Sequence, residues 1–137
     1  MGRILGIDYG TKRIGLALSD DGQILASPLT VVHGERELHN EIERLFRSES
    51  IERFVVGLPL NMNGSIGPKA QEVLAFKARL EKRFGLPVDT SDERLSTIQA
   101  EGALREAGLS FRKRAQRIDK VAAQILLQAY LDRQQDS

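Results

Sequence analysis

Three acidic residues, far apart along the chain, are the strongest candidates for chemistry. Asp8 ends an apolar run at residues 4–7, and a glycine-bearing turn follows it at once. An unpaired carboxylate inside such a strand would be costly to bury, whereas an acid at its end is well placed to hold a cation. Glu93 and Asp119 lie where a folded chain could bring them beside Asp8. Whether the three side chains converge decides which chemistry is open to the protein.

Each acid also has a plain structural interpretation. Asp8 could simply begin a turn, as aspartate commonly does. Glu93 could complement a helix dipole from the first turn of a helix, and Asp119 allows the same interpretation near the start of the last helix. The side chain of Asp92 is expected to point away from Glu93. It would cap a helix or support the site from outside the ligand set. The remaining turn or surface acids are Asp20, Asp21 and Asp89.

Positive charge is concentrated beside Asp119, although the whole chain carries a formal net charge of only +1. The cluster spans a predicted loop and the start of the last helix and comprises Arg112, Lys113, Arg114, Arg117 and Lys120. Each phosphate contact formed there would release counterions, so this segment is expected to contact nucleic acid. The alternative is a run of solvated charge.

Two further segments offer groups that suit a nucleic-acid backbone. Thr11 and Lys12 follow the glycine turn, where a hydroxyl, backbone amides and an ammonium group could hold a phosphate. Asn61 and Asn63 lie in a loop that is expected near the same edge and could follow the backbone by hydrogen bonding. The alternatives are a hairpin turn with a solvated lysine and an ordinary connection.

Composition limits the class of protein. A length of 137 residues fits one domain, expected to span residues 1–137. The chain has no cysteine, which excludes disulfides, thiolate metal sites and cysteine nucleophiles. Its two histidines are too few for a zinc site built on them alone, because zinc usually takes three or four nitrogen or sulfur ligands. There is no signal-peptide pattern and no apolar run of membrane-spanning length, so a cytoplasmic protein without membrane contact is expected.

The hydrophobic pattern predicts the elements that must position these residues. Strands are expected at residues 3–9, 14–19 (half-buried), 24–32, 53–58 and 86–90, and helices at 35–47, 68–84, 95–107 and 117–133. The first three strands form an antiparallel meander, with Asp20-Asp21-Gly22 as a tight hairpin turn and Pro28 at a bulge or edge. Right-handed crossovers then add two parallel strands. The prediction is an α/β fold with a mixed five-stranded sheet flanked by helices.

Four segments carry a resemblance to a known family: residues 6–15 (GIDYGTKRIG), 55–64 (VVGLPLNMNG), 92–97 (DERLST) and 118–123 (IDKVAA). In order and spacing they resemble the YqgF/RuvX-type Holliday junction resolvases, also described as pre-16S ribosomal RNA nucleases. The resemblance covers nearly the whole chain, and the order of elements is similar to the ribonuclease H-like fold.

The resemblance implies metal-dependent cleavage of phosphodiesters in structured nucleic acid. It identifies Asp8, Glu93 and Asp119 as the catalytic and metal-binding carboxylates. Two divalent ions can activate water and stabilise the leaving oxygen, and Mg²⁺ or Mn²⁺ suits a set of carboxylate ligands. The cellular role implied is trimming of pre-16S rRNA at its 5′ end in ribosome biogenesis.

Other functions stay open at this point. A Holliday junction resolvase for DNA recombination or repair would use the same chemistry on branched DNA, and symmetric cutting would favour a homodimer. A non-catalytic RNA-binding assembly factor would bind without cleaving. An actin-like ATPase or sugar-kinase lobe begins with a similar acid and Gly-Thr turn, but such enzymes need two lobes and this chain has the length of one.

Overall fold

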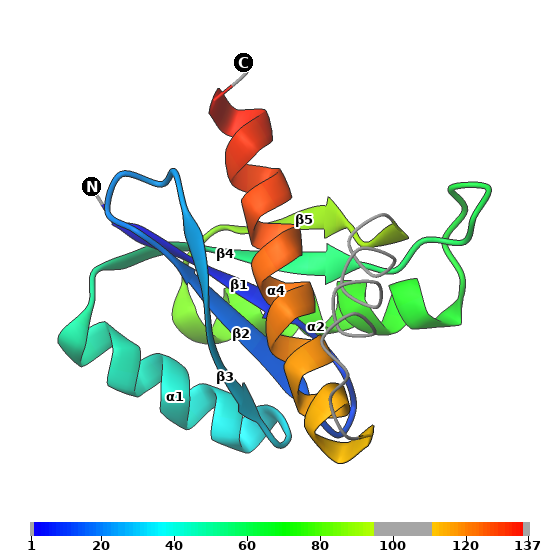
Figure 1. Ribbon diagram of the computed structural model, residues 1–137, viewed down its shortest axis with the longest axis horizontal. Helices are drawn as coiled ribbons and strands as arrows, with labels where there is room; N and C mark the ends of the chain where they lie inside the picture. Colours follow the sequence, from blue (N-terminus) through cyan, green and yellow to red (C-terminus); the bar gives the residue numbers. More distant parts are fainter. Residues whose placement is uncertain (1, 95–110, 136–137) are drawn as a thin grey trace.

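The computed structural model describes residues 2–94 and 111–135, and in the second range it describes side chains from residue 120 onward. Figure 1 shows the order of the elements. They are β1 (Arg3–Asp8), β2 (Ile14–Ser19), β3 (Ala26–Val32), α1 (Glu35–Ser48), β4 (Ile51–Leu58), α2 (Pro68–Phe84), β5 (Val88–Asp92) and α4 (Phe111–Gln135). The helix expected at residues 95–107 lies outside the described residues.

The strands form one five-stranded sheet in the order β3-β2-β1-β4-β5. Strand β2 pairs antiparallel with both β1 and β3, whereas β4 pairs parallel with both β1 and β5. This is the predicted meander followed by two parallel strands, so the predicted sheet topology is confirmed. The three parallel strands β1, β4 and β5 end at the same edge of the sheet, with their last residues Asp8, Leu58 and Asp92.

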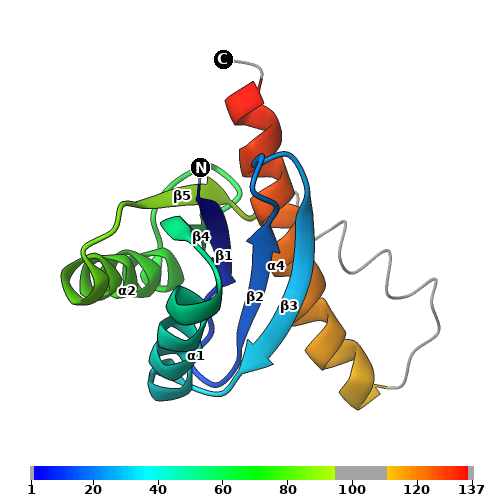
Figure 2. The ribbon, with the colours of Figure 1, turned by 90° about the vertical axis from the view of Figure 1, so that its left-hand side faces the viewer.

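Helices cover both faces of the sheet. Helices α1 and α2 lie on one face and α4 crosses the other (Figures 1 and 2). The larger core, on the α1 and α2 side, includes the β1 residues Leu5 and Ile7, and the smaller core, on the α4 side, includes Ile4 and Leu127. Successive residues of β1 therefore serve opposite cores, as the two-residue period of a strand requires.

Small residues of the sheet allow α4 to approach closely. A Cβ atom on Gly6 would lie only 2.8 Å from the Cβ atom of Leu127.

Strand β2 is buried on both faces, so the prediction of a half-buried strand is wrong. Ile14, Leu16 and Ala17 are all fully buried, and Ala17 packs against the same helix, α4. The alternation of large and small apolar residues in β2 reflects packing on both faces of the strand. It does not indicate a face exposed to solvent.

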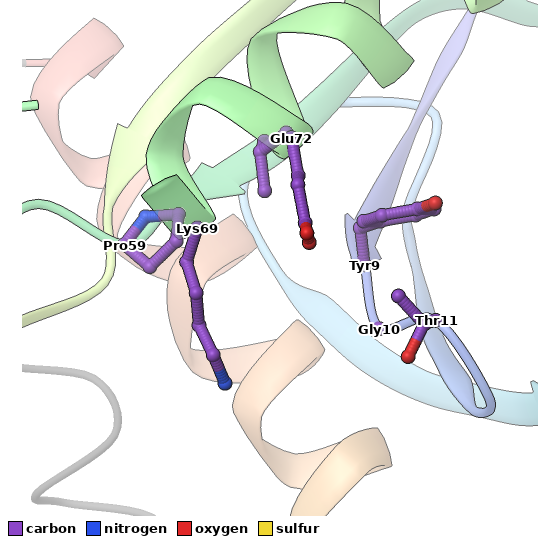
Figure 3. Close-up of a pocket in the computed structure, with 7 residues that line it drawn as sticks. Tyr9, Gly10, Thr11, Pro59, Lys69 and Glu72 are labelled. Carbon is purple, nitrogen blue, oxygen red and sulfur yellow. The ribbon is translucent and has the colours of Figure 1, made fainter. Parts of the chain in front are cut away.

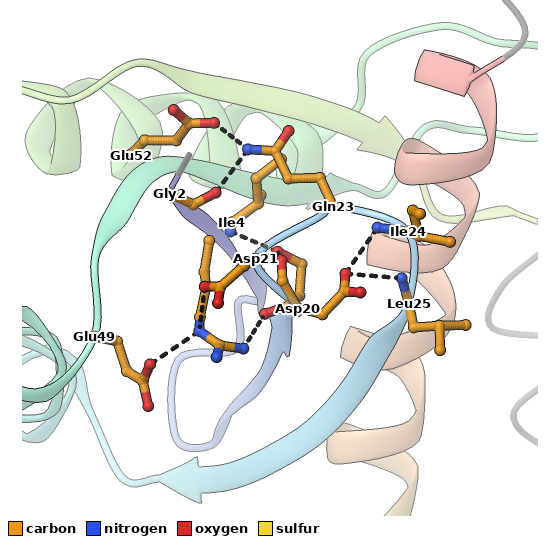
Figure 4. A network of polar contacts seen from close by, with 11 residues as sticks. Gly2, Ile4, Asp20, Asp21, Gln23, Ile24, Leu25, Glu49 and Glu52 are labelled. Atoms are coloured by element: carbon orange, nitrogen blue, oxygen red, sulfur yellow. Dashed lines mark hydrogen bonds and ion pairs between the residues drawn. The ribbon is translucent and has the colours of Figure 1, made fainter.

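The hairpin between β2 and β3 lies at the far end of the sheet from Asp8. The Asp20 carboxylate accepts hydrogen bonds from the backbone N–H groups of Ile24 and Leu25, at 2.8 and 3.1 Å (Figure 4). A positive φ, of 57°, occurs at Gln23 and not at Gly22. The loop is therefore longer than a two-residue hairpin, and β3 begins at Ala26, later than predicted.

The same network secures the start of β1. The Arg3 guanidinium lies 3.2 Å from the Asp21 carboxylate and 2.9 Å from that of Glu49 (Figure 4). Asp20 and Asp21 thus have the structural roles that the sequence suggested. Pro28 lies in the edge strand β3, beside an irregularity in its register with β2, as expected.

Further boundaries differ from the prediction, including the start of β4, which lies at Ile51 and not at residue 53. Strand β5 covers Val88–Asp92, so it begins and ends two residues later than the predicted strand at 86–90. Helix α4 begins at Phe111 and not at residue 117. Arg112, Lys113 and Arg114 therefore lie on a helix and not in a loop, because arginine, lysine and alanine are good helix formers and nothing in residues 111–117 breaks a helix. In the described part of the chain, no helix has the length and apolarity needed to cross a membrane.

Candidate nuclease site at the edge of the sheet

The candidate site lies where β1, β4 and β5 end together. Ile7 pairs with Val56, and Leu58 pairs with Asp92, so Asp8, Gly57 and Glu93 occupy neighbouring positions at this edge. The backbone N–H of Glu93 donates to the carbonyl of Leu58 at 3.2 Å, which holds the residue after β5 beside the end of β4. Parallel strands thus bring together two acids that are far apart in the sequence.

The side chains of Asp8 and Glu93 are hydrogen-bonded to each other. The pKa of Asp8 is raised from 3.8 to about 9, first by burial, and then by the hydrogen bond and the charge repulsion from Glu93. Two adjacent carboxylates resist joint ionisation, so the charge repulsion between them favours a cation at this place. The structure thus brings together two of the three acids singled out in the sequence.

Gly57 makes room for this pair. A Cβ atom at residue 57 would lie 2.6 Å from the Cγ atom of Glu93, closer than such contacts occur in proteins. The Glu93 side chain lies flat against the backbone of β4 for this reason. Sequence reasoning missed Gly57, although an isolated glycine in an apolar strand is a recognised sign of close approach by another group.

Arg94 links the end of β5 to the loop that follows β4. Its guanidinium group contacts the Asp92 carboxylate, with Nε to Oδ2 at 2.9 Å, and donates to the carbonyl oxygen of Met62 at 3.0 Å. The hydrogen bonds from Arg94 lower the pKa of Asp92. Asp92 is therefore engaged by Arg94, and this bridge fixes the residues on both sides of Glu93.

Asn61 and Asn63 use their side chains within their own loop. The Asn61 amide donates to Ser65 Oγ at 2.9 Å, and Asn63 Oδ1 accepts from the backbone N–H of Ser65 at 3.0 Å. The loop is tightly bonded, and both residues are exposed. Contact between these residues and nucleic acid stays a prediction.

A cavity of about 270 Å³ opens beside the same edge, on the face covered by α2 (Figure 3). Thr11 lines this cavity, while both Thr11 and Lys12 are exposed in the turn after β1. The turn is tight, because a Cβ atom on Gly10 would lie 2.5 Å from the carbonyl oxygen of Arg13. The lining residues are Tyr9, Gly10, Thr11, Pro59, Lys69, Glu72 and Val73.

The remaining predicted site residues lie on α4. The backbone of Asp119, Arg117 and the other basic residues is helical, but their side chains are outside the described part, with the exception of the half-buried Lys120. Among the described side chains, no group of three or more acidic or histidine residues could hold a metal ion. The convergence of three acids is thus observed for Asp8 and Glu93 and stays a prediction for Asp119.

Comparison with known proteins identifies close relatives. A family model described as "RuvX: Holliday junction resolvase" matches residues 2–133. A protein of Moorella thermoacetica named "Putative pre-16S rRNA nuclease" is 50% identical over 134 residues, covering 96% of this chain and 95% of the relative. A Streptococcus pneumoniae protein of the same name is 46% identical over 136 residues, covering 96% and 98%. These matches confirm the family predicted from the four segments.

Solved structures show the same fold at low identity. RuvC of T. thermophilus, in complex with a Holliday junction substrate, superposes with a TM-score of 0.55 at 21% identity, covering 96% of both chains. A Fowlpox virus resolvase, in complex with Holliday junction DNA, gives a TM-score of 0.54 at 11% identity, covering 96% and 98%. These similarities confirm the predicted ribonuclease H-like fold.

Proposed function

The chain belongs to the RuvX family of Holliday junction resolvases, and on that premise we propose that it is a divalent-metal-dependent endonuclease acting on structured nucleic acid. The observation that carries the proposal is the contact between the carboxyl groups of Asp8 and Glu93 at the edge of the sheet. Metal-dependent hydrolysis of a phosphodiester needs anionic ligands gathered at one point that the substrate can reach. No other described feature of the chain supplies it.

The residues present suit a hard divalent cation. Both ligands are carboxylates, the donors that Mg²⁺ and Mn²⁺ prefer. Burial is the main cause of the raised pKa of Asp8, and the further contribution from the charge of Glu93 is the one that a cation between the two groups would relieve. Asp8 and Glu93 would hold the metal, with Asp119 as the third ligand. When bound, divalent ions would supply an activated water and charge stabilisation at the leaving oxygen.

The backbone of α4 supports the inclusion of Asp119. The carbonyl oxygen of Ala123 lies 3.4 Å from the position that a Cβ atom on Gly6 would occupy, and Gly6 is two residues before Asp8. Asp119 is four residues, about one helical turn, before Ala123 on a helix whose later residues, including Tyr130 and Leu131, belong to the core around Ile4. Helix α4 therefore runs toward the Asp8 end of β1 as it is followed back to residue 119.

The other residues at this edge would position the substrate. Gly57 keeps Glu93 against β4, and Arg94 holds the adjoining loop, so the acidic pair is arranged before a substrate arrives. Lys12, in the turn after β1, and Lys120, next to Asp119 on α4, would offer ammonium groups for phosphate contacts. The basic residues on the first turns of α4 would extend this contact along the nucleic-acid backbone.

We propose RNA as the substrate, in the 5′-end processing of pre-16S rRNA. The relatives at 46–50% identity bear the name of a pre-16S rRNA nuclease, whereas the junction resolvases share only the fold, at 11–21% identity. Resolution of branched DNA by a homodimer is the second candidate, because the family model carries that description. A symmetric junction would require two copies of the site.

Cleavage assays distinguish these functions. A precursor RNA with the 5′ extension of 16S rRNA, the same sequence as a single strand, and a four-way DNA junction are each incubated with Mg²⁺ or Mn²⁺. Metal-dependent cutting of the precursor RNA is expected. Paired symmetric cuts in the junction alone would favour the resolvase. Binding without products from any substrate, at any metal concentration, would indicate an assembly factor and would contradict the proposal.

A further inference from the structure

The cavity beside the site edge is lined in part by residues that follow β1 and β4, two of the three strands that end at this edge. Tyr9, Gly10 and Thr11 directly follow Asp8, and Pro59 directly follows the end of β4 (Figure 3). Its volume of about 270 Å³ is near the lower end of the range for small-molecule sites, about 300–1,000 Å³. The space therefore suits a unit about as large as one nucleotide, adjacent to the candidate cleavage site.

The apolar side of the cavity is held rigidly. The Tyr9 ring stacks on the ring of Phe76, with centroids 4.2 Å apart and planes 20° from parallel. The Tyr9 hydroxyl donates to Glu35 at 3.2 Å, and Glu35 is paired with Arg79. Val73 is buried and completes this wall. A ligand ring could pack here without ordering the protein further, which lowers the cost of binding.

The polar side combines a cation, a carboxylate and a hydroxyl. Lys69 and Glu72 are three residues apart on α2, so they share one side of the helix, and both are exposed. Neither makes a hydrogen bond or an ion pair with any residue in the described part of the chain. Figure 3 shows the Glu72 carboxylate directed from α2 toward Tyr9, with the Thr11 hydroxyl across the cavity.

This combination excludes a bare phosphate as the best ligand. Lys69 would attract a phosphate, but the Glu72 carboxylate can only accept hydrogen bonds and repels anions. A ligand must therefore present a hydrogen-bond donor to Glu72, a phosphate to Lys69 and an apolar surface to Val73. A ribonucleotide has all three, since its 2′-hydroxyl is a donor that a deoxyribonucleotide lacks.

We propose that this cavity binds the nucleotide next to the scissile phosphate and that Glu72 accepts a hydrogen bond from its 2′-hydroxyl. The proposal rests on the nuclease function proposed above. With DNA in the site, the carboxylate loses its donor and stays beside the sugar without a partner, which weakens binding. Glu72 is thus a specificity residue that favours RNA.

The test is a binding experiment that needs no cleavage. A fluorescently labelled RNA stem-loop with a single-stranded 5′ extension, and DNA of the same sequence, are titrated with the protein in EDTA at one salt concentration. The wild type should bind the RNA about tenfold more tightly than the DNA, the difference expected for one hydrogen bond to a charged group. Glu72→Ala should bring this ratio close to one, largely by improving the binding of DNA.

Matched variants separate the two polar groups. Glu81→Ala removes an acid from the far end of the same helix and should leave the ratio unchanged. Lys69→Gln should weaken RNA and DNA equally and keep the ratio, whereas Lys82→Gln, exposed near the end of α2, should change neither affinity. Circular dichroism checks that each variant is folded.

The outcomes separate this proposal from the one on which it rests. A wild type without RNA preference, or a Glu72→Ala variant that keeps the wild-type ratio, would overturn the role of Glu72 even if the protein cleaves RNA. A ratio that depends on Glu72 in a protein that cleaves no substrate would keep the cavity assignment and overturn the nuclease function.

Discussion

At the scale of single residues, the contact between Asp8 and Glu93 is electrostatically unfavourable when both carboxyl groups are ionised and no cation lies between them. Burial, followed by the hydrogen bond and repulsion from Glu93, raises the pKa of Asp8 from 3.8 to about 9. Because the folded protein then holds a proton that the unfolded chain releases, the stability linked to Asp8 is fully present below the unfolded pKa of 3.8. It is lost as the pH rises through about 9.

Asp8→Asn should therefore stabilise the metal-free protein near neutral pH. The amide needs no ionisation, so the free energy of unfolding should increase by about 1–3 kcal/mol, the usual cost of an ill-matched buried polar group. Thermal unfolding in EDTA measures this. The difference between variant and wild type should be larger at about pH 8 than at about pH 5. A difference that does not vary with pH would contradict the assigned pKa.

Gly57→Ala should impair catalysis with little loss of stability. The new Cβ atom would lie 2.6 Å from Cγ of Glu93, and the end of this flexible side chain can move aside. Displacing a catalytic group by about 1 Å can cost about 100-fold in rate, so cleavage should fall at least tenfold. Cleavage rate and melting temperature are measured together.

Gly22→Ala is the matched control, because its Cβ atom would have no neighbour closer than 3.7 Å. Equal cleavage by the Gly57 and Gly22 variants would show that the position of Glu93 is unimportant.

At the scale of elements, the site depends on how closely α4 lies against β1. Gly6→Ala would place a Cβ atom 2.8 Å from Cβ of Leu127, which is not the end of a flexible side chain. The helix must shift, so a loss of about 1–3 kcal/mol in unfolding free energy is expected, as for other overpacked cores. Urea denaturation measures it. An unchanged midpoint would show that α4 is held less tightly than this contact implies.

The elements also show where sequence reasoning succeeds and where it stops. The apolar runs around Leu5 and Phe54 predicted the central strands, and the parallel order predicted that Asp8 and Glu93 would meet. The start of α4 was missed, because its basic first turns lack an apolar stripe. The isolated glycine at residue 57 indicates a close approach, but the group that approaches it could not be predicted from the sequence. The cavity beside Tyr9 could not be predicted either, since it depends on contacts between segments that only the folded register defines.

At the scale of the whole molecule, the candidate site extends from the edge of the sheet onto both of its faces. Asp8 ends β1 and Glu93 follows β5. Helix α4, with its basic first turns, lies on one face of the sheet, and α2, which lines the cavity, lies on the other (Figures 1 and 2). A nucleic-acid strand crossing this edge would meet the basic turns, the acids and the cavity in turn. The small net charge of +1 makes this local distribution, and not the total, decisive for binding.

Replacing Arg112, Lys113 and Arg114 together by glutamine should weaken nucleic-acid binding and flatten its salt dependence. Each lost phosphate contact lowers the slope of log affinity against log salt by about 0.7–0.9, so the slope should fall by up to about 2–3. Fluorescence anisotropy at several salt concentrations measures the slope. An unchanged slope would show that these residues are only solvated.

The control replaces three exposed basic residues of the α1 and α2 helices, Arg36, Arg47 and Lys82, by glutamine. The net charge falls by the same amount, but the slope should stay close to that of the wild type. If both triple variants lose slope equally, binding would depend on total charge and not on the turns of α4.

The most direct test of the acidic pair as a metal site is the binding of Mn²⁺, followed by electron paramagnetic resonance. The wild type should bind the ion, whereas Asp8→Asn and Glu93→Gln should each weaken binding at least tenfold, and the exposed Asp132→Asn should bind like the wild type. Wild-type affinity in both the Asp8 and Glu93 variants would contradict the assignment of these two carboxylates as ligands.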